Sequence, residues 1–149
     1  MPSRTPIKEF DFQPGRILAK KYRVHSLLGK GWEGEAYRLT ELRSGVERAG
    51  KFFYPQRNPN NRTLKHYAQK LHKLRHCPVL IQYHTQENFW NRGHLVPFLV
   101  SEFVEGEVLS DFLVRQKGKR LHYFHALHLI YALSKGLECI HRAKEYHGD

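Results

Sequence analysis

The sequence is poor in cysteine, methionine and acidic residues, and it lacks any long apolar run. Its 149 residues include 2 Cys, 1 Met and 14 Asp or Glu, against 25 Lys or Arg. Cys77 and Cys139 form no C-x-x-C pair and offer no disulfide framework, which fits a reducing compartment. No apolar run approaches the ~20 residues of a membrane span, and the amino terminus lacks the apolar core of a signal peptide. We therefore expect a soluble, cytoplasmic chain without a membrane partner.

The shortage of acids leaves a formal net charge of +11, which favours phosphate-bearing partners such as a nucleotide or a nucleic acid. A basic run could bind nucleic-acid phosphate, but a solvated helix face is the commoner meaning of such a run. We therefore do not expect nucleic acid as a partner. The run consists of Arg57, Arg62, Lys65, Lys70, Lys73 and Arg75.

The first half of the sequence contains a motif of three glycines. Gly29, Gly31 and Gly34, with Lys30 between the first two, have the G-x-G-x-x-G spacing that lets backbone N–H groups approach phosphate. The spacing alone also fits dinucleotide-binding folds, which need a helix directly after the glycines. Residues 35–39 alternate polar and apolar and predict a strand instead. Residues 46–54 predict a further strand that carries Lys51.

The remaining pattern predicts an α+β fold. Residues 22–28, 35–39, 46–54, 80–87 and 95–103 read as five antiparallel strands, and residues 63–75 as one helix. Residues 108–116 and 123–144 predict two further helices, the second with an apolar stripe that we expect to be core. Residues 1–15 are polar and contain three prolines, so we expect them to wrap the surface or stay loose.

This order of segments resembles the protein-kinase superfamily, bacterial serine/threonine protein kinases in particular, from residue 22 to the His147-Gly148-Asp149 sequence. The resemblance implies that ATP binds with its phosphates on Lys51, that Asp149 accepts the proton of a protein substrate's hydroxyl, and that Mg²⁺ is required. It also implies an adenine site, with the hinge backbone at Glu102 and Val104. Further residues implied in nucleotide binding are the glycine-loop residues Gly29, Lys30, Gly31 and Gly34, with Ala36, Ala49, Ser101 at the pocket-gating position, and Glu107 near the ribose.

The sequence also departs from the family. The helix position that carries a lysine-pairing glutamate falls at Tyr67 or Ala68, and no acid occurs between Lys51 and Gln86. Glu33 adds a negative charge at the tip of the glycine loop. The asparagine and aspartate that bind Mg²⁺ in the family would lie beyond Asp149. We therefore predict a truncated kinase-like chain that is inactive alone and that could depend on a second chain for the rest of the large lobe.

We divide the chain into an extension (residues 1–21), a small lobe (22–104), and a hinge with the start of the large lobe (105–149). Two other functions stay open: a pseudokinase or nucleotide-binding interaction module, and a small-molecule kinase, which the glycine in His147-Gly148-Asp149 suggests. His72 and His76 have the i, i+4 spacing of zinc ligands beside Cys77, but no second pair or acid lies nearby. We therefore expect no metal site there.

Overall fold

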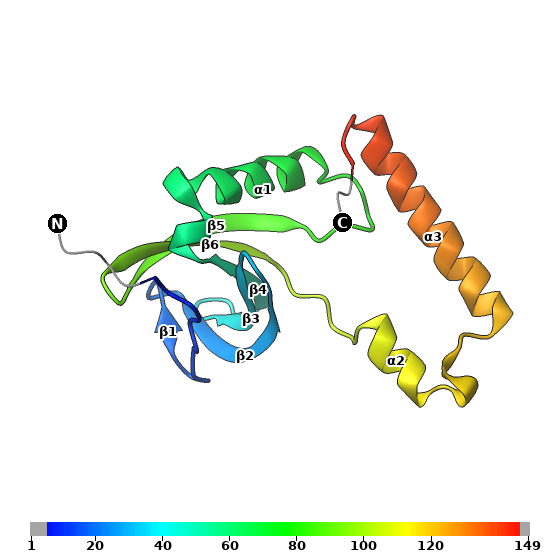
Figure 1. The fold of residues 1–149 in the computed structure, drawn as a ribbon, viewed down its shortest axis with the longest axis horizontal. Helices are drawn as coiled ribbons and strands as arrows, with labels where there is room; N and C mark the ends of the chain where they lie inside the picture. Colours follow the sequence, from blue (N-terminus) through cyan, green and yellow to red (C-terminus); the bar gives the residue numbers. More distant parts are fainter. Residues whose placement is uncertain (1–5, 147–149) are drawn as a thin grey trace. The chain divides into compact units, whose positions relative to one another are not determined.

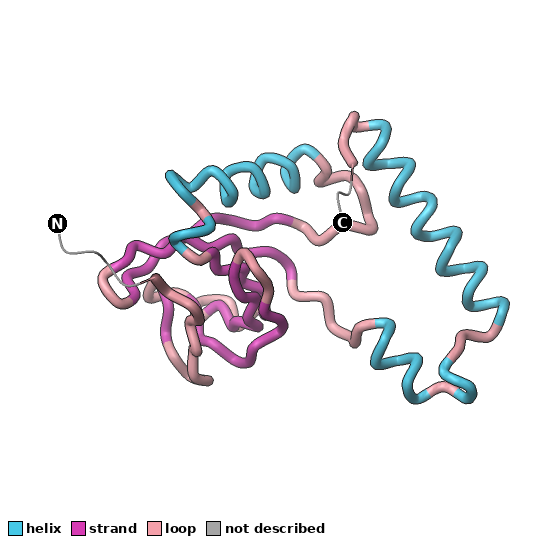
Figure 2. Tube along the Cα trace, viewed as in Figure 1, coloured by secondary structure: helices cyan, strands magenta, loops and turns pink. Residues whose placement is uncertain are grey.

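The computed structural model describes residues 6–146, which form two compact units. The first unit contains residues 6–72 and 81–103, and the second contains residues 73–80 and 104–146. Figures 1 and 2 show the helices and strands along the chain. Within residues 6–146, no helix is long and apolar enough to cross a membrane. The three-part division at residues 21 and 104 stays a prediction.

The first unit is built on an antiparallel sheet with the strand order β1-β2-β3-β4-β6-β5. Five of its strands confirm the predicted ones; β5 begins three residues later than predicted, because the chain turns where the N–H of Leu80 bonds to the carbonyl of Cys77. The sixth, β1, was not predicted because two residues show no periodicity. The strands are β1 (Ile17–Leu18), β2 (Tyr22–Lys30), β3 (Gly34–Glu41), β4 (Glu47–Phe53), β5 (Tyr83–Asn91) and β6 (His94–Glu102).

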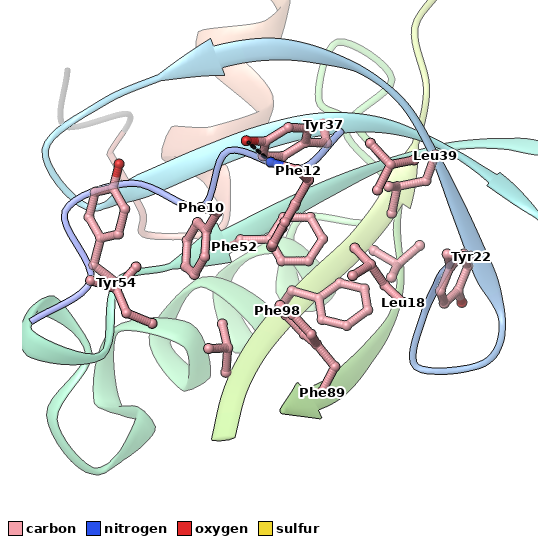
Figure 3. Packing of buried hydrophobic residues seen from close by; sticks show 14 residues of the cluster. Phe10, Phe12, Leu18, Tyr22, Tyr37, Leu39, Phe52, Tyr54, Phe89 and Phe98 are labelled. Atoms are coloured by element: carbon pink, nitrogen blue, oxygen red, sulfur yellow. Dashed lines mark hydrogen bonds between the residues drawn. The ribbon is translucent and has the colours of Figure 1, made fainter. Parts of the chain in front are cut away.

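The amino-terminal segment contributes three apolar side chains to the core, so the prediction that residues 1–15 stay on the surface or loose is wrong for these three. Ile7, Phe10 and Phe12 are all at least 95% buried. Phe10 and Phe12 stack on each other with ring centroids 5.1 Å apart and pack against Phe52 of β4 (Figure 3). The polar, proline-containing composition concealed three apolar residues that have no regular spacing.

The opposite face of the sheet is covered by α1 (Arg62–Lys73), within two residues of the predicted helix. Leu64 and Tyr67 of α1 pack with Phe53 and Leu99 of the sheet. The helix begins where the side chain of Asn58 accepts a hydrogen bond from the N–H of Leu64, at 3.1 Å. This capping satisfies one of the N–H groups that a helix start leaves unpaired. The face of the sheet toward α1 also carries Lys51.

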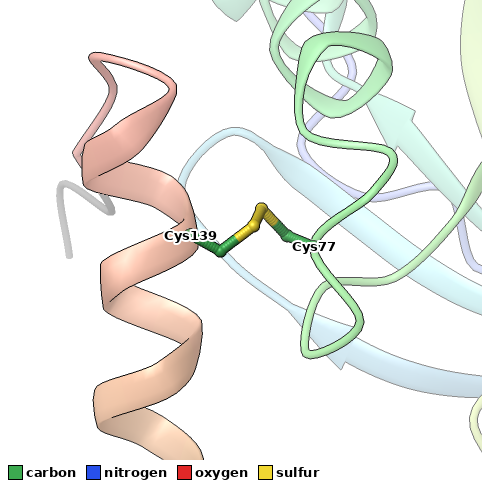
Figure 4. The surroundings of a disulfide bond; sticks show 2 residues. All are labelled: Cys77 and Cys139. Carbon is green, nitrogen blue, oxygen red and sulfur yellow. A yellow bond between two sulfur atoms is a disulfide. The ribbon is translucent and has the colours of Figure 1, made fainter.

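The second unit contains α2 (Leu109–Arg115), the short 3₁₀ helix η3 (Lys117–Lys119) and α3 (Tyr123–Arg142). A disulfide joins Cys77 to Cys139 of α3 (Figure 4), so the expectation of two unpaired cysteines is wrong. Sequence spacing could not reveal it, because 62 residues separate the partners. The predicted core stripe of α3 is largely exposed; of its apolar residues, Ile140 is buried, against Leu74 and Cys77.

Candidate functional site

Three neighbouring strands bring four of the predicted site residues to one face of the sheet. Cross-strand partners share a face, and the register pairs Ala36 of β3 with Lys51 of β4 and Ala49 of β4 with Ser101 of β6. Residues two apart on a strand also share a face, so all four lie together. The face also holds Phe53, which packs against α1.

The glycine loop is a hairpin between β2 and β3, and the predicted strand after it is confirmed. Gly29 pairs with Ala36 across the hairpin, and the N–H of Gly31 donates to the carbonyl of Gly34 at 2.9 Å. A Cβ at Gly34 would lie 1.8 Å from the carbonyl oxygen of Phe52, so packing requires glycine at that position. At Gly29 and Gly31 a Cβ would meet no atom within 4 Å, so packing does not require those two glycines. Open backbone there suits a loop whose N–H groups approach phosphate.

Lys51 points toward the loop tip and α1. Its amine lies 3.1 Å from Glu33 Oε2 and 3.9 Å from the ring centroid of Tyr67. The lysine side chain is 37% exposed, so it is half-buried. An ammonium over an aromatic face is attracted by the negative face of the ring, and this contact fixes where the amine lies.

The residue at the missing glutamate position is part of the same cluster. Tyr67 is one of the two α1 positions, with Ala68, at which the resemblance places a lysine-pairing glutamate, and its hydroxyl donates to Glu33 Oε2 at 2.8 Å. The carboxylate that pairs with Lys51 therefore comes from the glycine loop. Partial burial opposes ionisation of Glu33, but the hydrogen bonds from Tyr67 and Lys51 outweigh it and lower the pKa of Glu33.

At the end of β6, Ser101 is buried and its hydroxyl donates to the carbonyl of Glu102 at 3.2 Å. Glu102 is fixed against Gln82, because the N–H of Glu102 donates to the carbonyl of Gln82 and the N–H of Gln82 donates to the Glu102 carboxylate. A carbonyl oxygen has two lone pairs, so that of Glu102 can still accept a second hydrogen bond.

The remaining predicted site residues are Lys30, Val104, Glu107 and Asp149. Val104 and Glu107 belong to the second unit and are exposed, and the Glu107 carboxylate accepts a hydrogen bond from Arg115. Lys30, in the first unit, is paired with Glu9 at 2.8 Å. Asp149 lies outside the described residues. Within residues 6–146, no group of three or more His, Cys, Asp or Glu side chains could hold a metal ion, and Cys77 is bound in the disulfide.

Sequence reasoning missed Glu35, which is only 3% exposed. Its carboxylate accepts hydrogen bonds from the hydroxyls of Tyr37 and Tyr54, at 2.6 and 2.8 Å, and from the N–H of Phe10. Burial, and then the hydrogen bond to Glu35, raises the pKa of both tyrosine hydroxyls. The network joins the amino-terminal segment to the strand that follows the glycine loop. The alternation of Glu35 with buried Tyr37 and Leu39 was the available signal.

The sequence of this chain is similar to parts of longer known proteins. No family model matches the sequence. The chain is 28% identical over 137 residues to a probable serine/threonine-protein kinase of Streptomyces coelicolor, covering 90% of this chain and 20% of that protein. It is 29% identical over 136 residues to the serine/threonine-protein kinase PknA of Corynebacterium glutamicum, covering 89% of this chain and 29% of that protein. The chain thus spans less than a third of the length of these relatives.

A solved kinase-domain crystal structure matches with a TM-score of 0.76 at 17% identity, covering 90% of this chain and 39% of the other. This match shows the fold, and it agrees with the sheet, helix and glycine hairpin described above. The α+β class and the resemblance that the sequence suggested are both confirmed. The chain has the fold of a protein-kinase small lobe, followed by the first helices of the large lobe, and the proteins it resembles are bacterial serine/threonine protein kinases.

Proposed function

We propose that the first unit binds ATP as the nucleotide site of a serine/threonine protein kinase, which transfers the γ-phosphoryl group to a hydroxyl of a protein substrate. The observation that carries this proposal is the shared face of Ala36, Ala49, Lys51 and Ser101 next to the glycine hairpin. Phosphoryl transfer depends mainly on positioning and on neutralising charge, and these residues supply the parts that act on the nucleotide.

Each residue has a physical role in this proposal. Ala36 and Ala49 are small and half-exposed, so an adenine ring can lie against them. The Glu102 carbonyl, at the end of β6, accepts a hydrogen bond from the adenine amine. The N–H groups of the glycine loop approach the phosphates. The Lys51 ammonium has three donors, which can bond phosphate oxygens. The transfer also needs Mg²⁺, whose ligands are expected beyond Asp149, and the expected proton acceptor Asp149 lies outside the described residues.

The test is calorimetric titration of the whole chain with ATP, with and without Mg²⁺. Lys51→Ala should weaken binding by roughly tenfold or more, because a hydrogen bond between charged groups contributes about 1.5–3 kcal/mol. Lys21→Ala is the matched control, since Lys21 is an exposed lysine of the same unit that pairs with Glu87. Equal ATP affinity in Lys51→Ala and the unmodified chain would refute the phosphate role of Lys51.

One observation favours a second candidate, a nucleotide-binding module without transfer. No acid of α1 pairs with Lys51; its amine lies over the Tyr67 ring and is already paired with Glu33. A transfer assay with γ-labelled ATP, Mg²⁺ and a generic protein acceptor tests the kinase directly: labelled acceptor that is lost in Lys51→Ala supports it. No label is expected from this chain alone under either function, because the Mg²⁺ ligands are expected beyond Asp149.

A further inference from the structure

The glycine loop carries its own anion to the lysine that we assign to phosphate. Glu33 lies at the tip of the hairpin, outside the paired residues of β2 and β3, and its Oε2 accepts from both Lys51 and Tyr67. We propose that the Glu33 carboxylate takes the place of a nucleotide phosphate on Lys51, so that a nucleotide must displace it to bind. The proposal rests on the proposed function, because it concerns the same site and describes how that site is inhibited.

The position of Glu33 is fixed by its backbone as well as its side chain. The carbonyl of Glu33 accepts from the N–H of Tyr54 at 3.0 Å, directly after β4. Next to it, the ring of Trp32 lies under the guanidinium of Arg57 at 4.0 Å. The loop tip is thus attached to the end of β4 and to the segment that follows it. Because the backbone at Glu33 is already held, pairing with Lys51 costs rotamer freedom of the side chain but little backbone freedom, which favours the contact.

The two lysines beside the glycine loop are both in ion pairs. Lys51 is paired with Glu33, and Lys30 is paired with Glu9. Both lysines that the sequence assigned to nucleotide binding therefore have carboxylate partners. A phosphate oxygen beside Lys51 would lie close to the Glu33 carboxylate, and two like charges 4 Å apart weaken binding about fivefold even at the dielectric constant of water. Displacement of Glu33 removes this repulsion and frees the donors of both Lys51 and Tyr67.

The experiment measures ATP affinity in a double-mutant cycle on the whole chain. Glu33→Gln keeps the shape of the side chain and removes its charge, and it should bind ATP roughly tenfold more tightly, from loss of the ion pair and of the repulsion. Part of the gain should need Lys51, so Glu33→Gln should raise the affinity less in the Lys51→Ala background, where only the repulsion is removed, than in the unmodified chain. Glu41→Gln is the matched control, because it removes a carboxylate from the far end of β3 and should leave the affinity unchanged.

The outcomes separate this inference from the proposed function. Unchanged or weaker binding in Glu33→Gln, with a chain that still binds ATP, overturns the inference and makes Glu33 a residue that positions Lys51. Tighter binding that persists equally without Lys51 also overturns it, because the effect is then repulsion without occupation of the amine. If no variant binds ATP, Glu33→Gln included, the proposed function fails and the inference fails with it.

Discussion

Reduction of the disulfide between Cys77 and Cys139 should destabilise the second unit selectively. The bond closes a loop across 62 residues of sequence, for which the chain-entropy relation gives a stabilisation of about 4 kcal/mol. Loss of the bond also loosens the small core around it, where Leu74 and Ile140 are at least 97% buried. The expected result is a large shift of unfolding to lower urea concentration in the second unit.

Two probes distinguish the units in this experiment. Both tryptophans, Trp32 and Trp90, lie in the first unit, so their fluorescence reports its unfolding. Circular dichroism of helices reports mainly the second unit, because α2 and α3 contain 7 and 20 residues and α1 contains 12. Dithiothreitol should shift the dichroism transition strongly and the fluorescence transition much less. Cys139→Ser should reproduce the shift without reductant.

The reasoning would be refuted by a dichroism transition that dithiothreitol leaves in place. It would also fail if thiol titration of the chain, purified without reductant and unfolded in urea, found two free thiols, because the bond would then not form. Ser110→Ala provides a matched control for the hydroxyl that Cys139→Ser introduces, since Ser110 is exposed in the same unit. It should leave both transitions where they are.

Three further predictions concern the first unit. Gly34→Ala should destabilise it by several kcal/mol, because the new Cβ would overlap the Phe52 carbonyl. Gly31→Ala should change stability little, because its Cβ would meet no atom within 4 Å. Urea unfolding followed by tryptophan fluorescence compares the two variants. Phe10→Ala should cost about 3–5 kcal/mol by the same measurement, since the ring is 1% exposed, and a cost below 1 kcal/mol would contradict its place in the core. Because its contacts lower the pKa of Glu33, the stability they contribute is fully present above the ordinary carboxylate value of 4.5 and is lost as the pH falls through the lowered value. Unfolding between pH 7 and pH 3 should therefore show an acid loss of stability that is smaller in Glu33→Gln.

The strands around the glycine loop could be predicted because local periodicity determines them. Residues 35–39 alternate polar and apolar, which predicts a strand. In β3, the side of the strand that carries Leu39 is buried, and the other side faces the site. The core role of Phe10 could not be predicted in the same way, because it comes from an irregular segment that packs on strands distant in sequence. The disulfide was hidden for a similar reason, since pairing of Cys77 with Cys139 depends on where α3 lies within its unit.

Once the strand pairing is known, the sequence is enough to identify the carboxylate that pairs with Lys51. The chain has no acid between Lys51 and Gln86, so α1 cannot supply a carboxylate, and the glycine loop offers Glu33 and Glu35. Glu35 lies within β3, where alternation places it beside Tyr37 on the face covered by the amino-terminal segment. There its carboxylate oxygens accept hydrogen bonds from the Tyr37 hydroxyl and the N–H of Phe10. Glu33 precedes the strand and is free of that alternation, so it alone of the two can turn to the face of Lys51. The carboxylate that pairs with Lys51 therefore comes from the glycine loop, which we propose to cover the phosphates, and not from α1.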